Sequence, residues 1–327
     1  MRGLINRFPE FLADAISIGE NAGLTPATKQ INNIVISGLG GSGIGGTIIA
    51  QLIAHEAKVP VTVNKTYGIP EFVNENTLLI GCSYSGNTEE TLDAIEAAKE
   101  KGAQIACITS GGKLAEWAVR NNWNCIVVPG GNPPRAMVAY ALTELFFIMM
   151  HYQVISADYV SDLKAAAALV TENREALESQ GKELARQLNG KRIVAYADQT
   201  FAGVAERFRQ QVNENAKQLC WHHALPEMNH NELVGWAGGD KSIGVLILRN
   251  DSDHSRTKLR MDLSKDIYLK YTQTVIEVNS KGSSNVERAF FHILLGDWIS
   301  IHLAELNDID PIEIKVIDFL KSELGKV

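Results

Sequence analysis

Two segments of the sequence combine residue types that suit the binding of a phosphate group. In the first, Gly38-Leu39-Gly40-Gly41-Ser42-Gly43, the glycines permit a close approach of backbone N–H groups to a ligand just before a predicted helix. The second, Ser83-Tyr84-Ser85-Gly86-Asn87-Thr88, brings three hydroxyl side chains to another predicted helix start. Because a helix N-terminus carries free N–H groups and partial positive charge, both segments can hold an anion without a lysine or an arginine.

Each segment also has a simpler interpretation. The glycine segment matches the G-x-G-x-x-G pattern of dinucleotide-binding proteins, but the next predicted strand, residues 59–65, ends without the acidic residue that would bind the ribose. The hydroxyl segment could be an ordinary helix N-cap, with Asn87 or Thr88 as the capping residue. A cap needs only one hydroxyl, so the two segments together favour a phosphate site over a nucleotide site or a simple cap.

Short apolar runs alternate with longer amphipathic ones, which is typical of parallel strands connected by helices. The predicted strands are 33–39, 77–84, 104–109, 124–128, 192–197, 243–248 and 274–278. The predicted helices are 43–56, 87–101, 113–121, 135–152, 201–217, 255–271 and 286–306. A stretch rich in Ala, Glu, Leu and Lys, residues 158–188, predicts a helical connection. We therefore predict an α/β protein with an N-terminal domain of residues 1–153, which carries the phosphate-binding loop, and a C-terminal domain of residues 154–327.

The composition fits a globular protein that is large enough for two hydrophobic cores. Of the 327 residues, 45% are hydrophobic and 21% are charged. The formal net charge of −7 argues against a nucleic-acid partner, because such partners are bound through an excess of positive charge. A phosphate group must therefore be bound by local donors.

The sequence predicts a cytoplasmic protein that has no membrane association. Its most apolar stretch, residues 136–150, is interrupted by Glu144 and is shorter than the roughly 20 residues that span a bilayer. The first residues lack the apolar run and the cleavage site of a signal peptide. The four cysteines have neither C-x-x-C spacing nor a histidine pattern beside them, so we expect reduced thiols and no metal site.

Three further motifs follow the glycine and hydroxyl segments along the chain. They are Pro133-Pro134-Arg135, Asn213-Glu214-Asn215-Ala216-Lys217 and Leu225-Pro226-Glu227-Met228-Asn229-His230-Asn231-Glu232. With all five motifs in order, the sequence from about residue 30 to its end resembles the bifunctional phosphoglucose/phosphomannose isomerases, which are distant members of the phosphoglucose isomerase superfamily. The resemblance implies two tandem SIS-type domains, each a mainly parallel sheet flanked by helices.

The resemblance also implies an aldose–ketose isomerase that needs no cofactor and acts on a phosphorylated hexose. It would interconvert glucose 6-phosphate, and mannose 6-phosphate as a second aldose, with fructose 6-phosphate through a cis-enediol(ate). Gly41 and Ser42 would line the sugar, while Ser83, Ser85 and Thr88 would bind its phosphate. The position that admits mannose 6-phosphate in the family does not align within residues 311–315, so the second substrate is left open.

Four residues would carry the chemistry by the same resemblance. Arg135 would stabilise the enediolate, and Glu214 would be the base. His230 would open the sugar ring of the neighbouring subunit, which implies a homodimer with shared active sites. The family's C-terminal lysine corresponds to Lys321, with Lys315 as a competitor. Taken alone, each of these residues is more simply read as a solvated surface residue or, for the histidine, as a loop residue bonded to backbone.

A function of a different class is a non-catalytic phosphosugar sensor, because tandem SIS domains also occur in regulators. A sensor should keep the hydroxyl segment and lose the base. The sequence has Arg135, Glu214 and His230 together, which favours the enzyme over the sensor. An NAD-dependent enzyme is the third possibility and depends on the glycine segment alone.

Overall fold

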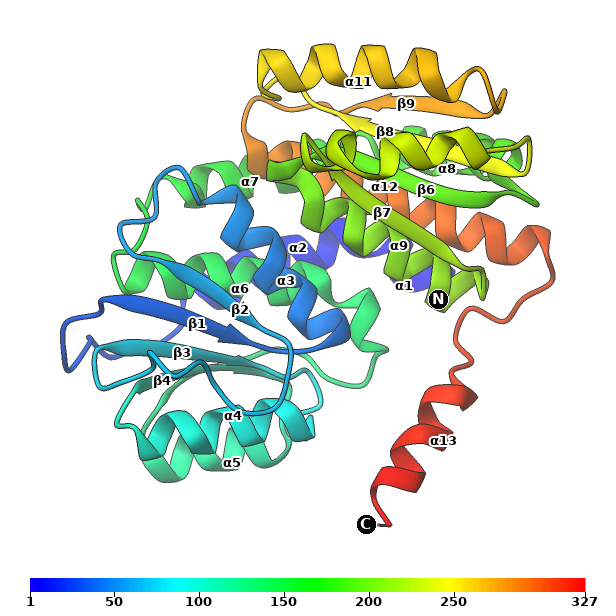
Figure 1. The fold of residues 1–327 in the computed structure, drawn as a ribbon. Helices are drawn as coiled ribbons and strands as arrows, with labels where there is room; N and C mark the ends of the chain where they lie inside the picture. Colours follow the sequence, from blue (N-terminus) through cyan, green and yellow to red (C-terminus); the bar gives the residue numbers. More distant parts are fainter. Residues whose placement is uncertain (327) are drawn as a thin grey trace.

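The computed structural model describes residues 1–326 and contains two parallel β-sheets with helices between and around them (Figure 1). The first sheet has the order β2-β1-β3-β4-β5 and the second the order β7-β6-β8-β9. The strands are β1 (Asn33–Ser37), β2 (Val61–Asn64), β3 (Thr77–Cys82), β4 (Gln104–Thr109), β5 (Asn124–Val127), β6 (Arg192–Asp198), β7 (Cys220–Leu225), β8 (Ile243–Arg249) and β9 (Val275–Asn279). All paired neighbours run parallel, so the predicted α/β fold class is confirmed.

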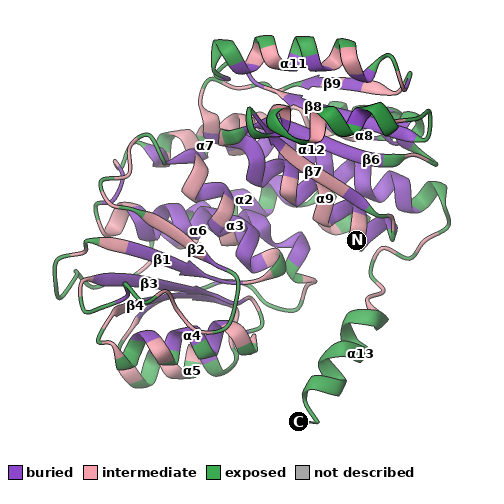
Figure 2. Ribbon diagram, in the orientation of Figure 1, coloured by how far each residue is buried: buried purple, intermediate pink, exposed green. Residues whose placement is uncertain are grey.

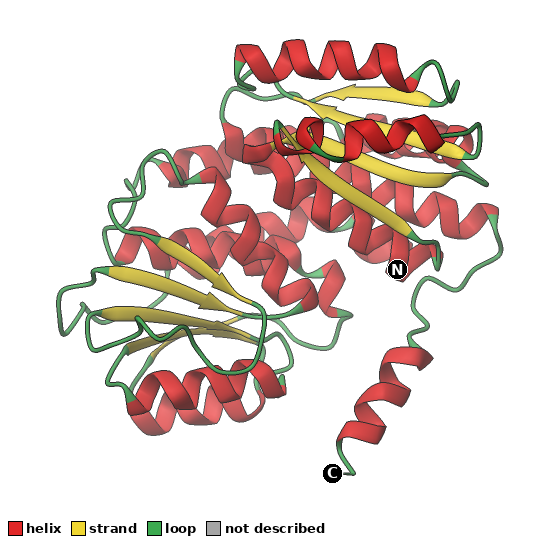
Figure 3. Ribbon diagram, in the orientation of Figure 1, coloured by secondary structure: helices red, strands yellow, loops and turns green. Residues whose placement is uncertain are grey.

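Helices cover both faces of each sheet (Figure 3). The α-helices are α1 (Arg2–Asn6), α2 (Phe8–Glu20), α3 (Gly40–Leu52), α4 (Glu89–Glu100), α5 (Gly112–Asn121), α6 (Val138–His151), α7 (Tyr159–Glu172), α8 (Arg174–Leu188), α9 (Ala202–Ala216), α10 (Glu232–Gly235), α11 (Ser255–Tyr268), α12 (Asn285–Leu306) and α13 (Lys315–Leu324). Short 3-10 helices are η1 (Pro134–Ala136), η2 (Gln199–Phe201), η3 (Glu227–His230) and η4 (Trp236–Gly238).

The two sheets share one large apolar core, although the composition suggested two. This core joins side chains from both halves of the chain, such as Ile36 of β1, Phe146 of α6, Phe208 of α9 and Trp298 of α12. Smaller clusters fill the outer face of each sheet, beneath α4 and α5 in the first and beneath α11 in the second. Figure 2 shows the buried helices concentrated between the sheets. The two halves are packed together mainly by α3 against α9 and by α2 against α7.

Helix α12 is the longest helix of the described chain and lies inside this core. By length and composition alone it could cross a membrane, but 89% of its most apolar stretch is buried within the protein. It packs against α7, α8 and α9. Its apolar character is therefore explained by its position between the other helices.

The structure differs from the sequence-based elements at a few places. Strand β7 was not predicted, because it lies at the edge of its sheet and its sequence, Cys-Trp-His-His-Ala-Leu, is buried only in part. The N-terminal helices α1 and α2 were also missed. Helices α7 and α8 occupy the stretch that was expected to be a helical connection, and the predicted domain boundary at residue 153 falls between α6 and α7.

Candidate active site

The predicted phosphate-binding segments follow two adjacent strands of the first sheet. The strand order changes direction between β1 and β3, which is the point at which open α/β sheets bind their ligands. The glycine segment comes directly after β1, and the hydroxyl segment directly after β3. The backbone N–H of Tyr84 donates to Ser42 Oγ at 3.0 Å, so the two segments are in direct contact.

The hydroxyl groups of the second segment form a compact cluster. Ser83 Oγ lies 2.8 Å from Thr88 Oγ1 and accepts a hydrogen bond from the Thr88 N–H at 3.3 Å. Ser85 Oγ accepts from the N–H of Asn87 at 3.2 Å. Thr88 occupies the N-cap position of α4 but makes no side-chain cap hydrogen bond. The hydroxyls therefore do not serve as a simple cap, and the first N–H groups of α4 stay available to a ligand.

The two loops have exposed residues at Gly40, Ser85 and Asn87, and they border a small cavity. Behind the loops lies a cavity of about 10 Å³, lined by Ser42, Ser83, Thr109 and Tyr140 among others. This volume admits at most about one water molecule. The cavity is therefore too small for a hexose phosphate.

Arg135 is held against the glycine segment by close backbone packing. It lies in η1, after the two prolines, and only 3% of its surface is exposed. A Cβ atom on Gly41 would come within 2.9 Å of the Arg135 backbone nitrogen. Since real Cβ atoms do not approach so closely, the glycine is needed to bring the phosphate loops and Arg135 together.

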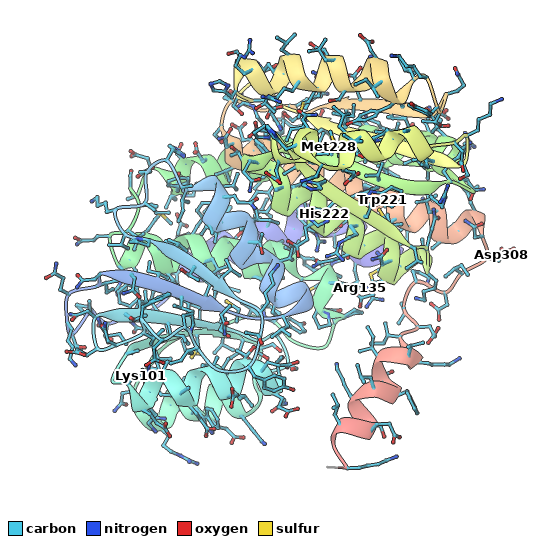
Figure 4. All side chains as sticks on the ribbon, in the orientation of Figure 1. Lys101, Arg135, Trp221, His222, Met228 and Asp308 are labelled. Carbon is cyan, nitrogen blue, oxygen red and sulfur yellow. The ribbon has the colours of Figure 1, made fainter. Side chains whose placement is uncertain are left out.

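The Arg135 guanidinium joins the two halves of the chain, between which it lies (Figure 4). Its Nη1 donates to Glu214 Oε1 at 2.9 Å, and its Nε donates to Asn215 Oδ1 at 2.8 Å. Its Nη2 donates to the backbone carbonyls of Pro311 and Ile312. The Glu214 side chain is 30% exposed, so the carboxylate borders solvent while the arginine is buried.

A second layer of buried polar residues supports Arg135, and the sequence analysis did not predict it. Arg207 donates to the Arg135 carbonyl oxygen at 3.1 Å and to both carboxylate oxygens of Asp297 at 2.8 Å. Gln211 also donates to Asp297, and Asn215 donates to Ser300 Oγ at 3.0 Å. Burial raises the pKa of Asp297. One signal was available, since Asp297 interrupts the apolar stretch between Ile293 and Ile299.

Lys217 binds the C-terminal segment beside Arg135 and Glu214. Its Nζ donates to the backbone carbonyls of Glu214 at 2.8 Å, Asp310 at 3.1 Å and Glu313 at 2.6 Å. Burial, and then the charge of Arg135, lowers the pKa of Lys217. The motif Asn213–Lys217 thus contributes a carboxylate, an amide and a lysine to one junction.

His230 is presented to solvent by a well-anchored turn. Asn229 donates to Ser264 Oγ at 2.9 Å, and Asn231 donates to Glu227 Oε1 at 2.8 Å. The carboxylate of Glu232 accepts hydrogen bonds from Trp221 and Tyr196. His230 itself is exposed, and its ring has no hydrogen-bond partner among residues 1–326.

One chain does not bring His230 to Glu214. The end of α9 lies at the start of β7, where the Cys220 N–H donates to Asn213 Oδ1 at 2.9 Å, whereas His230 follows the end of β7. A strand of six residues spans roughly 20 Å, at about 3.3 Å per residue. Figure 4 shows Met228, in the same short helix as His230, well separated from Arg135. The two predicted catalytic residues therefore lie at opposite ends of one strand.

The C-terminal lysines also lie apart from Arg135 in the single chain. Lys315 and Lys321 belong to α13, which has no buried residue and extends away from the body of the protein (Figure 1). Neither lysine side chain forms a hydrogen bond or an ion pair within the part of the chain that the structure describes. The structure therefore groups Arg135 and Glu214 with the phosphate loops, and leaves His230 and Lys321 outside this group.

The corresponding place in the second sheet does not suit phosphate. Its order changes direction between β6 and β8; β6 ends at Asp198, and the segment after β8 carries Asp253. Burial, with a further contribution from the charge of Asp198, raises the pKa of Asp253 to about 6. Carboxylates at this position would repel an anion, so this end of the second sheet is less suited to a phosphate group than the predicted segments of the first sheet.

Comparisons with known proteins agree with this architecture. Residues 29–134 match the SIS domain family, and residues 177–324 match the family described as the bacterial phospho-glucose isomerase C-terminal SIS domain. The bifunctional phosphoglucose/phosphomannose isomerase of Caldicellulosiruptor bescii is 35% identical over 99% of this chain and 98% of its own length. This chain belongs to the bifunctional phosphoglucose/phosphomannose isomerase family.

Other relatives show how far this isomerase family extends. The bifunctional phosphoglucose/phosphomannose isomerase of Aquifex aeolicus is 36% identical, with 90% of each chain covered. The D-glucosamine-6-phosphate 4-epimerase of Sulfolobus acidocaldarius is 33% identical over 79% of this chain and 81% of its own. The family thus lies close in sequence to a protein named for a different reaction on a hexose phosphate.

The fold of the isomerase family is also found in more distant solved structures. The C-terminal domain of glucosamine-fructose-6-phosphate aminotransferase from Francisella tularensis superposes with a TM-score of 0.76 at 15% identity, over 94% of this chain and 96% of its own. Glucosamine-6-phosphate deaminase from Thermotoga maritima gives a TM-score of 0.70 at 17% identity, with coverages of 94% and 96%. The predicted tandem SIS-type architecture is therefore confirmed.

Proposed function

We propose that this chain is an aldose–ketose isomerase that interconverts glucose 6-phosphate with fructose 6-phosphate, and accepts mannose 6-phosphate as a second aldose. The observation that carries the proposal is the ion pair between Arg135 and Glu214 beside the two phosphate-binding loops. A phosphosugar sensor would need the loops alone. A carboxylate and a guanidinium that share one edge of the phosphate site supply a base and a stabilising cation for proton transfer.

The reaction follows from the positions of these groups. In the proposed mechanism the hydroxyls and free N–H groups of the loop after β3 bind the phosphate, and the sugar carbons lie near Arg135 and Glu214; the support is the uncapped start of α4 beside the hydroxyl cluster. The Glu214 carboxylate takes the proton from C2 of the open aldose, and the electron pair of that C–H bond forms the C1–C2 double bond of an enediolate. Arg135 stabilises the charge on the enediolate oxygen. The hydroxyl proton on O2 then moves to O1, and return of the proton from Glu214 to C1, as the C2–O bond becomes a carbonyl, gives the ketose.

The reaction needs no external oxidant or reductant. C2 is oxidised from an alcohol to a ketone while C1 is reduced from an aldehyde to an alcohol, so the electrons balance within one substrate. The proposal therefore assigns no step to a nicotinamide cofactor, and none to a metal ion.

His230 completes the site as a residue of a second subunit in our proposal. Its turn is anchored by three neighbouring side chains, yet its ring faces solvent at the far end of β7 from Glu214. An anchored, outward-facing histidine can act on a sugar that is bound to another copy of the chain, where it would move the ring-opening proton. The active enzyme is accordingly a homodimer in which each site takes Arg135 and Glu214 from one chain and His230 from the other.

We assign this activity to the cytoplasm. The cysteines Cys82, Cys107, Cys125 and Cys220 are free thiols in the structure, which suits a reducing compartment. Fractionation of the source cells followed by an assay for fructose 6-phosphate formation tests the location.

A coupled assay of the purified full chain tests the function. Fructose 6-phosphate should form from glucose 6-phosphate and from mannose 6-phosphate. Binding of these sugars without turnover would make the protein a sensor, and epimerisation of glucosamine 6-phosphate without isomerisation would give it the reaction of its epimerase relative.

A further inference from the structure

Helix α13 presents an apolar stripe that nothing in its own chain covers. Val316 is 81% exposed, Phe319 65% and Leu320 57%, and Ile317 and Leu324 complete the stripe. At about 100° per residue these five side chains fall on one side of the helix, where Glu323, paired with Lys326, is the one charged residue among them, while Asp318 and Ser322 fall on the other side. Five exposed apolar side chains on ten residues are expected where a helix binds another surface.

The segment just before α13 is bound to residues of the candidate active site. Each of residues 310–313 accepts a hydrogen bond through its backbone carbonyl. Arg135 donates to the carbonyls of Pro311 and Ile312. Lys217 donates to those of Asp310 and Glu313. The helix therefore starts at the place where a second subunit must approach if it is to deliver His230. It then extends outward from the body of its own chain (Figure 1).

We propose that α13 is an arm that packs its apolar stripe onto a second copy of this chain, against the surface formed by η3 and α10 beside that copy's His230. The proposal rests on the shared active site proposed above. If His230 of the second copy reaches Glu214, its flanking helices η3 and α10 come to lie where α13 leaves Arg135. Two such arms, each crossing to the other subunit, satisfy the two-fold symmetry of a homodimer.

The chemistry of the two surfaces is complementary. Val234 of α10, four residues after His230, is 78% exposed and offers an apolar contact. Residues 227–235 contain two glutamates and no lysine or arginine, whereas residues 315–326 contain three lysines, one aspartate and one glutamate. An arm with a net positive charge thus meets an acidic surface. At about 1.5 Å per residue, α13 is roughly 15 Å long, which is enough to cross a surface built from two short helices.

The arm also accounts for the position of Lys321. This lysine follows Ile317 by four residues, so it borders the apolar stripe. When the apolar stripe docks beside the second copy's His230, Lys321 comes to lie at the edge of the shared site, whereas in the single chain it is an isolated surface residue.

Photo-crosslinking in the full chain tests the contact directly. Benzoylphenylalanine in place of Phe319, in mixed ¹⁴N- and ¹⁵N-labelled protein, should give crosslinks between chains that map to residues 227–235 by mass spectrometry. The same group in place of Ser322, on the polar side of α13, is the matched control and should not label that segment. Crosslinks from position 319 that stay within one chain, or that map elsewhere, would overturn the proposal.

The double variant Val316→Ser/Leu320→Ser tests the energetic role of the arm. Its dimer dissociation constant, measured by analytical ultracentrifugation, should rise by at least about ten-fold, because two apolar side chains lose their burial. Asp318→Asn/Ser322→Ala should leave it unchanged. An unchanged dissociation constant in an active double variant would reject the arm and keep the isomerase. Crosslinking to residues 227–235 in a wild-type protein that isomerises no sugar would keep the arm and reject the proposed function.

Discussion

Arg135 Nη1 lies 2.9 Å from Glu214 Oε1, and this ion pair bridges residues that are 79 positions apart in the sequence. The arginine follows the last strand of the first sheet, and the glutamate lies in the last turn of a helix that packs against the second sheet. The candidate site is therefore built by both halves of the chain. Neither half has both the proposed phosphate-binding loops and the proposed base.

Replacement of Glu214 tests its role as the base. Glu214→Gln keeps the size of the side chain but removes its basic site, so kcat for fructose 6-phosphate should fall by about 10²–10⁴ while KM changes little. Exchange of the transferred proton with deuterated solvent should fall in parallel. Glu206→Gln, on the same helix and paired with Lys65, is the matched control and should keep full activity. A Glu214→Gln enzyme with normal turnover would remove this residue from the mechanism.

The hydroxyl cluster predicts the affinity for the phosphate group. Ser85→Ala/Thr88→Ala should raise KM for fructose 6-phosphate, because each lost bond to a charged phosphate costs about 1.5–3 kcal/mol. Initial rates over a range of substrate concentrations measure the change. Thr171→Ala, at a hydroxyl that bonds only to its own helix, should leave KM unaltered. An unaltered KM in the double variant would place the phosphate elsewhere.

Mixed dimers test the shared site. Glu214→Gln and His230→Ala subunits should each be weakly active alone, but a heterodimer contains one site with both residues intact and should recover about half of the wild-type activity. Differently tagged chains allow the heterodimer to be isolated before the assay. His230→Ala should also lower the rate of conversion of the cyclic sugar more than that of an open-chain substrate. Verified heterodimers that recover no activity would show that each chain supplies both residues to its own site.

Arg207 is expected to position Arg135 rather than to touch the sugar. Arg207→Met leaves Asp297 buried without its partner, so the free energy of unfolding should drop by about 3–5 kcal/mol. In Arg207→Met/Asp297→Leu no unpaired charge is left, and stability should largely return. The Arg135 carbonyl still lacks its donor in this double variant, so kcat should stay low. Urea unfolding measures the free energy of unfolding, and steady-state kinetics measure kcat. If both recover in the double variant, the role of Arg207 is structural only.

The buried Glu144 predicts a pH dependence of stability. Both of its carboxylate oxygens lack a hydrogen-bond partner among the described residues, and burial, with the charge of Asp14, raises its pKa from the ordinary 4.5 to about 9. Between these values the folded protein keeps a proton that the unfolded chain releases, so stability falls as the pH rises.

Glu144→Gln removes this titration, so its gain in melting temperature over the wild type should grow from pH 6 to pH 9, as the pH approaches the raised pKa of Glu144. Glu172→Gln, at an exposed position, is the control and should follow the wild type. A gap that is constant with pH would show that Glu144 is ionised in the folded protein.

The two strand-to-helix loops after β1 and β3, and most of the strands, could be predicted from the sequence because local physics determines them. A glycine or hydroxyl run between an apolar strand and a helix places free N–H groups at the helix start wherever the unit is packed. The central strands are buried on both faces, so they read as continuous apolar runs. Strand β7 lies at a sheet edge and lacks that signal.

The tertiary structure decided where the catalytic candidates lie. The sequence of α9 predicts that its polar side faces solvent. In the structure Arg207, Gln211 and Asn215 of this side are buried. Their burial is possible because α12 and η1, which are distant in sequence, supply hydrogen-bond partners. The sequence by itself determined which residues could bind phosphate and move a proton. Only the packing of the two halves determined that Arg135 meets Glu214 and that His230 faces away, since those contacts depend on partners far apart along the chain.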